Sequence, residues 1–227
     1  MGKIGGVKSI VYNLPLNLGL GRGVIIGFHS LYYASNVWAG NTRWLGIEVE
    51  KCPLDLWVYQ EVISHIRPEV IIESGTHKGG SALFLASICD LVNRGKIITI
   101  DISERENMPK HERIKYIVGS SVAEQTVKEI QGLIDSTMKT MVILDSDHSM
   151  EHVLKELRIY SQFVSVGSYL IVEDTNINGH PVLHSFGPGP MEAVDQFLKE
   201  NNSFVEDKGK EKFHLTFNPK GYLLRVK

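Results

Sequence analysis

The sequence predicts a Rossmann-like α/β fold: a mainly parallel sheet between helices, with an antiparallel hairpin at its C-terminal end. Three observations lead to this expectation. From residue 69 onward, short β-branched runs alternate with helical segments, which is typical of βαβ units. The first of these runs ends in a glycine-rich turn, and acidic residues stand where several others end. Strands that lack an apolar/polar alternation are expected to be buried on both faces.

The elements follow in a regular order. Five strands are expected, over 70–72, 96–101, 116–118, 141–145 and 168–174. Five helices are expected, over 56–66, 80–93, 122–137, 150–163 and 190–201. Asp55 is a candidate N-cap for the first helix, and Pro68 is expected to end it.

The tail contains two further runs of strand type, 212–217 and 221–226, joined by residues 218–220. A connection of three residues suits an antiparallel pair, because parallel strands need a long crossover. The tail is therefore expected to form a hairpin.

The chain divides into two parts. Residues 1–50 are rich in glycine and aromatic residues without a clear period, and are interpreted as an N-terminal cap or oligomerisation segment. Their apolar side chains could be buried in a dimer interface or fold back over the ligand site, and a homo-oligomer is expected. Residues 51–227 are expected to form the Rossmann-like domain. A chain of 227 residues suits one such domain better than two independent ones.

Composition excludes several classes of protein. A net charge of −2 argues against a nucleic-acid-binding protein, which needs a basic surface. No apolar stretch approaches the ~20 residues of a membrane span, and no secretory leader or myristoylation pattern is found at the N-terminus. Cys52 and Cys89 are expected to be reduced and buried. The cytoplasm is the expected location, without a membrane partner.

The glycine-rich turn is a candidate cofactor site. Gly75 and Gly79 permit a tight turn and a close approach to a ligand, but their spacing matches neither the dinucleotide fingerprint nor the P-loop. Asp101 ends the second strand, where a carboxylate can accept hydrogen bonds from ribose hydroxyls. A nucleoside without phosphate groups fits S-adenosylmethionine better than NAD. The candidate cofactor-binding residues are Glu73, Gly75, Thr76, His77, Gly79, Ser81, Asp101, Ser120, Ser121 and Asp145.

Each of these signals also has a purely structural interpretation. The glycines could form an ordinary tight turn, and Asp101 could be a turn or capping residue. Ser120 and Ser121 suit an adenine edge, but they could equally cap the following helix.

Acidic residues end two later strands. Asp145 follows the fourth strand, and Glu173 and Asp174 follow the fifth. Neighbouring strand ends lie ~5 Å apart, so the three carboxylates should converge, and a cation is needed to offset their repulsion. Oxygen ligands suit Mg²⁺, or Mn²⁺, and such an ion could lower the pKa of an acceptor hydroxyl.

His148 is the candidate general base, with Asp145 as its catalytic partner. Alternatively, His148 is simply paired with a carboxylate at a helix N-terminus. Asp147 could support the site or, like Ser149, cap the helix. His148 and His152 are four residues apart, as in a helical metal-binding pair, but no third nitrogen or sulfur ligand accompanies them.

Several long motifs together resemble the cephalosporin hydroxylase / rhamnosyl O-methyltransferase family. They are WLG at 44–46, KCPLDLWVYQE at 51–61, ESGTHKGGSALF at 73–84, LDSDHS at 144–149, VEDTNINGHPV at 172–182, GPGPMEAV at 187–194 and FNPKGYLLR at 217–225. The resemblance implies a class I methyltransferase fold, S-adenosylmethionine as cofactor and transfer of a methyl group to a hydroxyl of a sugar or other small molecule.

The resemblance also implies roles for single residues. Glu73, Gly75, Ser81 and Asp101 would line the methionine and ribose part of the cofactor site, and Asp145, Glu173 and Asp174 would bind magnesium. Related metal-dependent methyltransferases carry a lysine where this chain has His148, which leaves the general base open. Residues 180–190 would form either a substrate lid or a rigid connection.

Two other functions are considered. The family name suggests an Fe(II)-dependent hydroxylase, which needs two histidines and one carboxylate, and His148 with Asp145 or Asp147 could supply part of that set. A non-catalytic cofactor-binding subunit is the other alternative; it would bind the cofactor without turnover.

Overall fold

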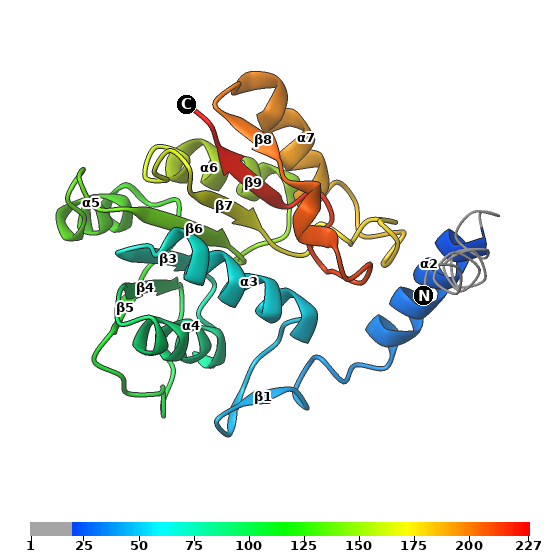
Figure 1. Ribbon diagram of the computed structural model, residues 1–227, viewed down its shortest axis with the longest axis horizontal. Helices are drawn as coiled ribbons and strands as arrows, with labels where there is room; N and C mark the ends of the chain where they lie inside the picture. The colour runs from blue at the N-terminus through cyan, green and yellow to red at the C-terminus, as the bar shows by residue number, and fades with distance from the viewer. Residues whose placement is uncertain (1–19) are drawn as a thin grey trace, which may run out of the picture.

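The computed structural model describes residues 20–227, which form a seven-stranded sheet covered by helices on both faces (Figure 1). The helices are α2 (Leu20–Ala34), α3 (Pro53–Ile66), α4 (Gly80–Leu91), α5 (Glu124–Leu133), α6 (Met150–Tyr160), α7 (Pro190–Glu200) and the 3₁₀ helix η1 (Lys208–Glu211). The sheet contains β3 (Val70–Ser74), β4 (Lys96–Asp101), β5 (Ile114–Val118), β6 (Thr140–Leu144), β7 (Tyr169–Val172), β8 (Phe204–Glu206) and β9 (Tyr222–Arg225). A small antiparallel pair, β1 (Arg43–Trp44) and β2 (Ile47–Glu48), lies apart from it.

The strand order is β5-β4-β3-β6-β7-β9-β8. The first five strands in this order are parallel, as predicted, and β9 pairs antiparallel with both β7 and β8. The chain runs from β3 outward to β4 and β5, then returns to place β6 on the other side of β3. The order therefore reverses between β3 and β6, which is where open α/β sheets bind their ligands.

Two apolar clusters hold the layers together. On one face, α3 and α4 pack against the sheet through side chains such as Tyr59, Ile63 and Leu85. On the other face, residues of α5, α6 and α7 such as Ile130, Leu157 and Phe197 form the second cluster. Because both faces are covered, every residue of β3, β6 and β7 is buried.

The C-terminal antiparallel strands are present, but the expected hairpin of 212–217 with 221–226 is wrong in its first strand. The partner of β9 is β8, and residues 212–217 form no strand. Leu215 and Phe217 instead bury their side chains in a third cluster with Cys52, and His214 has a φ of 65° that breaks an extended run. Packing against the N-terminal segment therefore replaces strand pairing here.

The predicted capping role of Asp55 is also wrong. Helix α3 begins three residues earlier than predicted, at Pro53, with Cys52 at the cap position. The Asp55 carboxylate is buried and accepts hydrogen bonds from the Thr216 hydroxyl, the Phe217 N–H and the Tyr222 hydroxyl. Asp55 thus fixes the same 212–217 segment that the sequence pattern assigned to a strand.

The described part of the N-terminal segment is dominated by α2, of which Val24, Phe28 and Leu31 are exposed. His29 is buried, stacks on Phe217 at 5.6 Å between ring centroids, and accepts a hydrogen bond from the Asn176 amide at 2.9 Å. Tyr32, Tyr33 and Trp38 also contact the Phe217 ring. The part of the predicted cap that precedes residue 20 lies outside the described residues, and the homo-oligomer and the domain division stay predictions.

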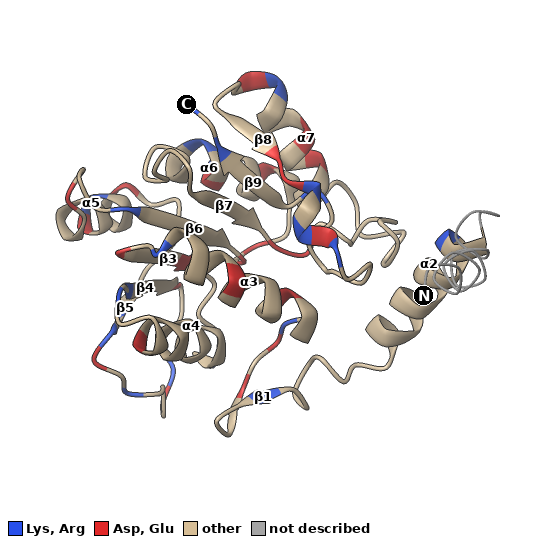
Figure 2. Ribbon diagram, in the orientation of Figure 1, with Lys and Arg blue, Asp and Glu red and all other residues tan. Residues whose placement is uncertain are grey.

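Charged residues are distributed widely over the described chain. Lys and Arg are scattered along the ribbon without a continuous basic stripe in Figure 2. Among the described helices, none has both the length and the apolar character that crossing a bilayer requires.

Candidate active site

The turn between β3 and α4 brings the ends of β3 and β6 into close contact. Gly75 has a φ of +88°, and a Cβ atom on it would lie 1.7 Å from the carbonyl oxygen of Asp145. A side chain at this position would therefore push the β6 end away. The Asp145 N–H donates to the Ser74 carbonyl at 3.0 Å, and the Glu173 N–H donates to the Leu144 carbonyl at 3.0 Å. These two hydrogen bonds join the end of β3 to that of β6 and the end of β6 to that of β7, so Asp145 and Glu173 follow neighbouring strand ends.

Asp101 lies where two cavities meet. Its carboxylate accepts the His77 and Ser103 backbone N–H groups, each at 2.9 Å, so the side chain has a fixed orientation. The smaller cavity, of about 230 Å³, extends toward the turn after β5, and the larger, of about 440 Å³, extends toward β6 and β7. Gly75, Asp101, Ile102 and Ser146 line both.

The predicted cofactor residues divide into two groups. Those that line one or both of these cavities are Gly75, His77, Asp101, Ser121 and Asp145. Those that do not line them are Glu73, Thr76, Gly79, Ser81 and Ser120. Glu73 is fully buried beneath the turn, where it accepts a hydrogen bond from Thr99 at 2.7 Å, and burial raises the pKa of its carboxyl. Its position suits support of the turn, while its predicted contact with the cofactor stays a prediction.

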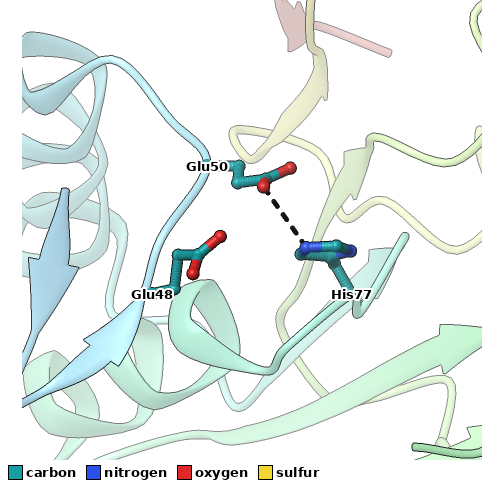
Figure 3. Close-up of side chains that lie close together, drawn as sticks. All are labelled: Glu48, Glu50 and His77. Carbon is teal, nitrogen blue, oxygen red and sulfur yellow. Dashed lines mark ion pairs between the residues drawn. The ribbon is translucent and has the colours of Figure 1, made fainter. Parts of the chain in front are cut away.

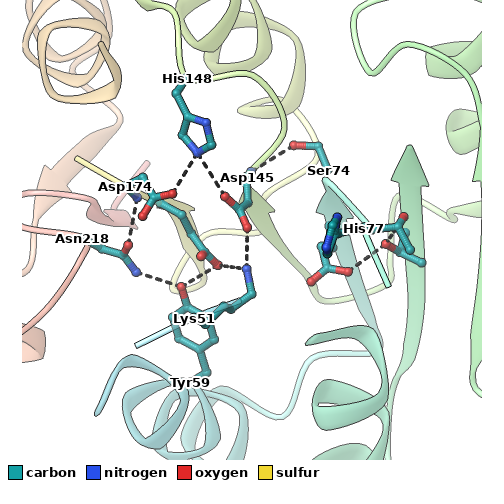
Figure 4. A network of polar contacts seen from close by, with 12 residues as sticks. Lys51, Tyr59, Ser74, His77, Asp145, His148, Asp174 and Asn218 are labelled. Carbon is teal, nitrogen blue, oxygen red and sulfur yellow. Dashed lines mark hydrogen bonds and ion pairs between the residues drawn. The ribbon is translucent and has the colours of Figure 1, made fainter. Parts of the chain in front are cut away.

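Asp145, His148 and Asp174 form a cluster at the floor of the larger cavity (Figure 4). Each offers one potential ligand atom, and these atoms lie within 4.8 Å of one another. The His148 Nε2 atom is 2.9 Å from Asp174 Oδ2 and 3.4 Å from Asp145 Oδ1. Two predicted metal ligands and the predicted general base therefore converge.

The two carboxylates favour a positive charge between them. Burial alone would lower the pKa of His148, but the hydrogen bonds and charges of Asp145 and Asp174 outweigh it and raise the pKa to about 11. The site thus has the electrostatic character of a cation-binding site.

Glu173, the third predicted metal ligand, binds residues outside the Asp145 cluster. Its Oε1 atom accepts hydrogen bonds from Lys51 Nζ at 2.7 Å and from the Tyr59 hydroxyl at 2.8 Å. Its other oxygen has no hydrogen bond within the described chain. Glu173 is therefore a neighbour of the cluster and not one of its three converging residues.

Lys51 is a functional residue that sequence reasoning missed. It is 4% exposed, and its ammonium also donates to Asp145 Oδ2 at 2.6 Å. The Asn218 side chain extends this network, because it donates to the Tyr59 hydroxyl at 2.8 Å and accepts the Asp174 N–H at 3.1 Å. Lys51 and Tyr59 stand in the motif KCPLDLWVYQE, but nothing in the motif indicated that they face the acidic strand ends.

A second group of potential ligands lies at the edge of the larger cavity (Figure 3). The His77 Nε2 atom is 3.3 Å from Glu50 Oε1, and Glu48 is close to both. Glu48 already binds the Lys78 ammonium at 2.6 Å. An internal cation therefore neutralises part of this group, and both His77 and Glu50 are substantially exposed.

The pair His148 and His152 does not act together. His152 Nε2 lies 3.2 Å from the hydroxyls of Ser121 and Ser146, at the smaller cavity. Asp147 accepts the Ser149 backbone N–H at 2.7 Å, and Ser149, not Asp147, stands at the N-cap position of α6, where its side chain makes no capping hydrogen bond.

Apolar side chains form the outer wall of the larger cavity. Tyr33 and Trp38 come from the N-terminal segment, and Ile177, Leu183 and Phe186 come from the loop before α7. Glu192 on α7 binds the loop through the His180 ring at 2.8 Å, the Asn178 amide at 3.1 Å and the Gly189 N–H at 2.7 Å. These contacts tie the loop to α7.

Comparisons with known proteins identify the family. The model of the family described as rhamnosyl O-methyltransferase/CmcI matches residues 36–226. A rhamnosyl O-methyltransferase of Mycobacterium bovis (strain BCG / Pasteur 1173P2) is 40% identical over 205 residues, covering 87% of this chain and 83% of the relative. The corresponding protein of Mycobacterium leprae (strain TN) is 38% identical over 204 residues, covering 87% and 89%.

Solved structures show the same fold. A CmcI structure described as containing Mg and SAM superposes with a TM-score of 0.64 at 21% identity, covering 82% of this chain and 77% of the other. The MycE methyltransferase in complex with Mg, SAH and mycinamycin VI has a TM-score of 0.51 at 16% identity, covering 75% and 45%. With the family match over 36–226, these findings show that the chain belongs to the rhamnosyl O-methyltransferase/CmcI family of S-adenosylmethionine-dependent O-methyltransferases.

Proposed function

We propose that this enzyme transfers the methyl group of S-adenosylmethionine to a hydroxyl oxygen of a sugar or other small-molecule acceptor, with Mg²⁺ (or Mn²⁺) bound at the ends of β6 and β7. The observation that carries the proposal is the convergence of Asp145, His148 and Asp174 at the floor of a cavity that Asp101 also lines. The relatives named as rhamnosyl O-methyltransferases support a sugar acceptor.

The cofactor is proposed to lie across the two cavities. Asp101 stands at their junction, where its carboxylate can accept hydrogen bonds from ribose hydroxyls. The smaller cavity then receives the adenine ring, and the larger one receives the methionine part and the acceptor. The reactive methyl group would thus face the Asp145 cluster.

The charges of the site fit one divalent cation. With His148 in the neutral form, Asp145, Glu173 and Asp174 supply three carboxylates and Lys51 supplies one ammonium, which leaves two negative charges in excess. Asp145 and Asp174 each present an oxygen to the cluster, and Glu173 retains the oxygen that Lys51 and Tyr59 do not use. When bound there, Mg²⁺ would lower the pKa of a coordinated acceptor hydroxyl.

His148 is proposed to take the proton of the acceptor hydroxyl. Its Nε2 atom already lies among the carboxylates, so an oxygen bound in the cluster would be within its reach. The base must be neutral to accept a proton, and a cation that offsets the charges of Asp145 and Asp174 would lower the pKa of His148 toward that state. The apolar wall of Tyr33, Trp38 and Phe186 would pack against the face of the acceptor ring and exclude water.

The iron-dependent alternative lacks its ligands in this arrangement. A site of that type needs two histidines with one carboxylate. Within residues 20–227, His148 is the histidine of the Asp145 cluster, and His152 points to Ser121 and Ser146 instead.

Calorimetric titration of S-adenosylmethionine, with and without Mg²⁺, tests the cofactor site. The wild-type protein should bind, and Asp101→Ala should weaken binding by roughly tenfold or more, because a ribose hydrogen bond to a charged group is lost. Asp135→Ala, which removes an exposed carboxylate, is the matched control. Absence of binding by the wild-type protein in either condition would overturn the proposal.

The metal site has its own test. Mn²⁺ binding, followed by electron paramagnetic resonance, should be seen for the wild-type protein and lost in Asp145→Asn and Asp174→Asn. A methyl-transfer assay with deoxysugar glycosides should show activity that a chelator removes and Mg²⁺ restores. Full activity in the presence of the chelator would exclude the metal from the reaction, while leaving the cofactor proposal intact.

A further inference from the structure

The smaller cavity has a polar wall whose geometry the proposed reaction does not explain. It lies between the end of β4 and the turn after β5, with Ile100 and Ile102 as apolar surfaces. The same cavity is lined by Ser121 from the β5–α5 turn and by Ser146 and His152 from the β6–α6 region. A flat heterocycle would be held between apolar faces there, with polar groups at its edge.

Behind this wall lies a buried carboxylate. Glu156 on α6 is 0% exposed, and its Oε1 atom accepts a hydrogen bond from the Ser146 hydroxyl at 2.8 Å. Its Oε2 atom is buried without a hydrogen-bond partner in the described chain. Such a group is costly unless a positive charge stands beside it. The His152 ring supplies that charge, with Nε2 at 3.6 Å from Glu156 Oε1.

The carboxylate determines which hydrogens face the cavity. Hydrogen bonding to Glu156 raises the pKa of His152, which favours the imidazolium. The Ser146 hydroxyl gives its hydrogen to Glu156, and His152 Nε2–H faces the serine oxygens at 3.2 Å. The Ser121 hydrogen is then free for a ligand. His152 Nδ1–H likewise has no hydrogen bond within residues 20–227.

We propose that Glu156 is a positioning residue for adenine recognition, because it binds the Ser146 hydroxyl and holds the His152 ring against Ser121, which leaves the Ser121 hydroxyl as a donor toward a ring nitrogen of the cofactor. This inference rests on the proposed placement of the cofactor. The ring nitrogens of adenine are acceptors, so they match a wall that offers donors.

The test combines ligand analogues with variants. Calorimetry measures the binding of S-adenosylhomocysteine and of its analogues in which carbon replaces ring nitrogen N1, N3 or N7. The wild-type protein should bind at least one analogue roughly tenfold more weakly, since one hydrogen bond to a buried donor is lost. Glu156→Gln should weaken the binding of S-adenosylhomocysteine by a similar factor. It should bind the discriminated analogue no more weakly than the wild-type protein does. Glu151→Gln, an exposed charge removal on the same helix, is the matched control.

A general loss of structure would weaken the binding of all four ligands, whereas loss of the proposed positioning would weaken some of them selectively. If Glu156→Gln weakened all four ligands equally or none of them, or if the wild-type protein bound the four equally, the inference would be overturned. Should Glu156→Gln fail to fold, the double variant His152→Gln/Glu156→Gln removes both charges together and should show the same loss of discrimination. Failure of the wild-type protein to bind S-adenosylhomocysteine at all would instead count against the proposed function.

Discussion

The Lys51 ammonium bridges the ends of two strands, at 2.6 Å from Asp145 Oδ2 and 2.7 Å from Glu173 Oε1. The side chains of Lys51 and Glu173 are 4% and 6% exposed, and that of Asp145, which lines the larger cavity, is 17% exposed, so the Glu173 end of the bridge is almost completely shielded from water. Lys51 thus belongs to the site as much as the carboxylates do, although it stands 94 residues before Asp145 in the chain.

Replacing Lys51 by Met is expected to destabilise the protein by about 3–5 kcal/mol, because two buried carboxylates lose their counter-charge. Urea unfolding measures the loss, and millimolar Mg²⁺ should recover part of it if a cation binds the same carboxylates. Lys155→Met, at an exposed position on α6, is the control. Equal stability of Lys51→Met and the wild-type protein would contradict the assigned role.

Two glycines of one turn should respond differently to alanine. At Gly75 the added Cβ would meet the backbone of Asp145 at 1.7 Å, and we expect a loss of about 3 kcal/mol or more together with loss of cofactor binding. At Gly79 the added atom would meet the Met108 and Pro109 side chains at 2.9 Å. A smaller loss of about 1–2 kcal/mol is expected there, mainly from its positive φ. Thermal unfolding and calorimetry compare the two, and the reverse ranking would contradict this account.

His148→Ala is expected to lower kcat by roughly 10²–10⁴-fold, the usual contribution of a general base. Binding of S-adenosylmethionine should change little, because His148 lies at the acceptor end of the larger cavity. The measurement is steady-state kinetics with calorimetry in parallel, and His65→Ala on the exposed side of α3 is the control. An unchanged kcat would assign the base to another group.

The docking of α2 should depend on pH through His29. Burial lowers the pKa of His29 from 6.5 to about 4. A lowered histidine pKa means that docking is fully favourable above pH 6.5 and weakens as the pH falls from 6.5 toward 4. The total loss is roughly 3 kcal/mol at most. Trp38 fluorescence and limited proteolysis should report release of α2 over this window, and His29→Phe should remove the dependence. Identical profiles for both proteins would assign the transition to another group.

Much of the sheet could be predicted from the sequence, because buried parallel strands have a local signature. β-branched runs such as those of β3 and β4 lie between glycine turns and helical periods, and all five parallel strands were found. The segment 212–217 has the same local pattern but forms no strand. Its apolar residues meet α2 and Cys52, contacts between distant parts of the chain that no local pattern encodes.

In the candidate site, too, the residues at the strand ends could be predicted, whereas those brought in by distant segments could not. Asp145, Glu173 and Asp174 were predicted to converge, since neighbouring strand ends meet at one edge of the sheet. Asp145 and Asp174 do converge, together with His148, whereas Glu173 binds Lys51 and Tyr59 instead. Lys51 and Glu156 were not predicted to contribute. Lys51 reaches the site from the segment before α3, and Glu156 on α6 binds Ser146 from behind the wall of the smaller cavity. Their roles depend on how helices pack over the sheet, which the strand pattern does not determine.

The position of Phe217 has a consequence for biosynthesis. Its ring lies between 5.4 and 5.6 Å from the ring centres of His29, Tyr33 and Trp38, which precede it by nearly the whole length of the chain. The ribosome makes α2 before all other described elements, yet the aromatic ring on which α2 packs is synthesised only after the five parallel strands. Helix α2 must therefore wait for Phe217 to be synthesised before its aromatic side chains can pack, a period in which nascent chains depend on chaperones for protection.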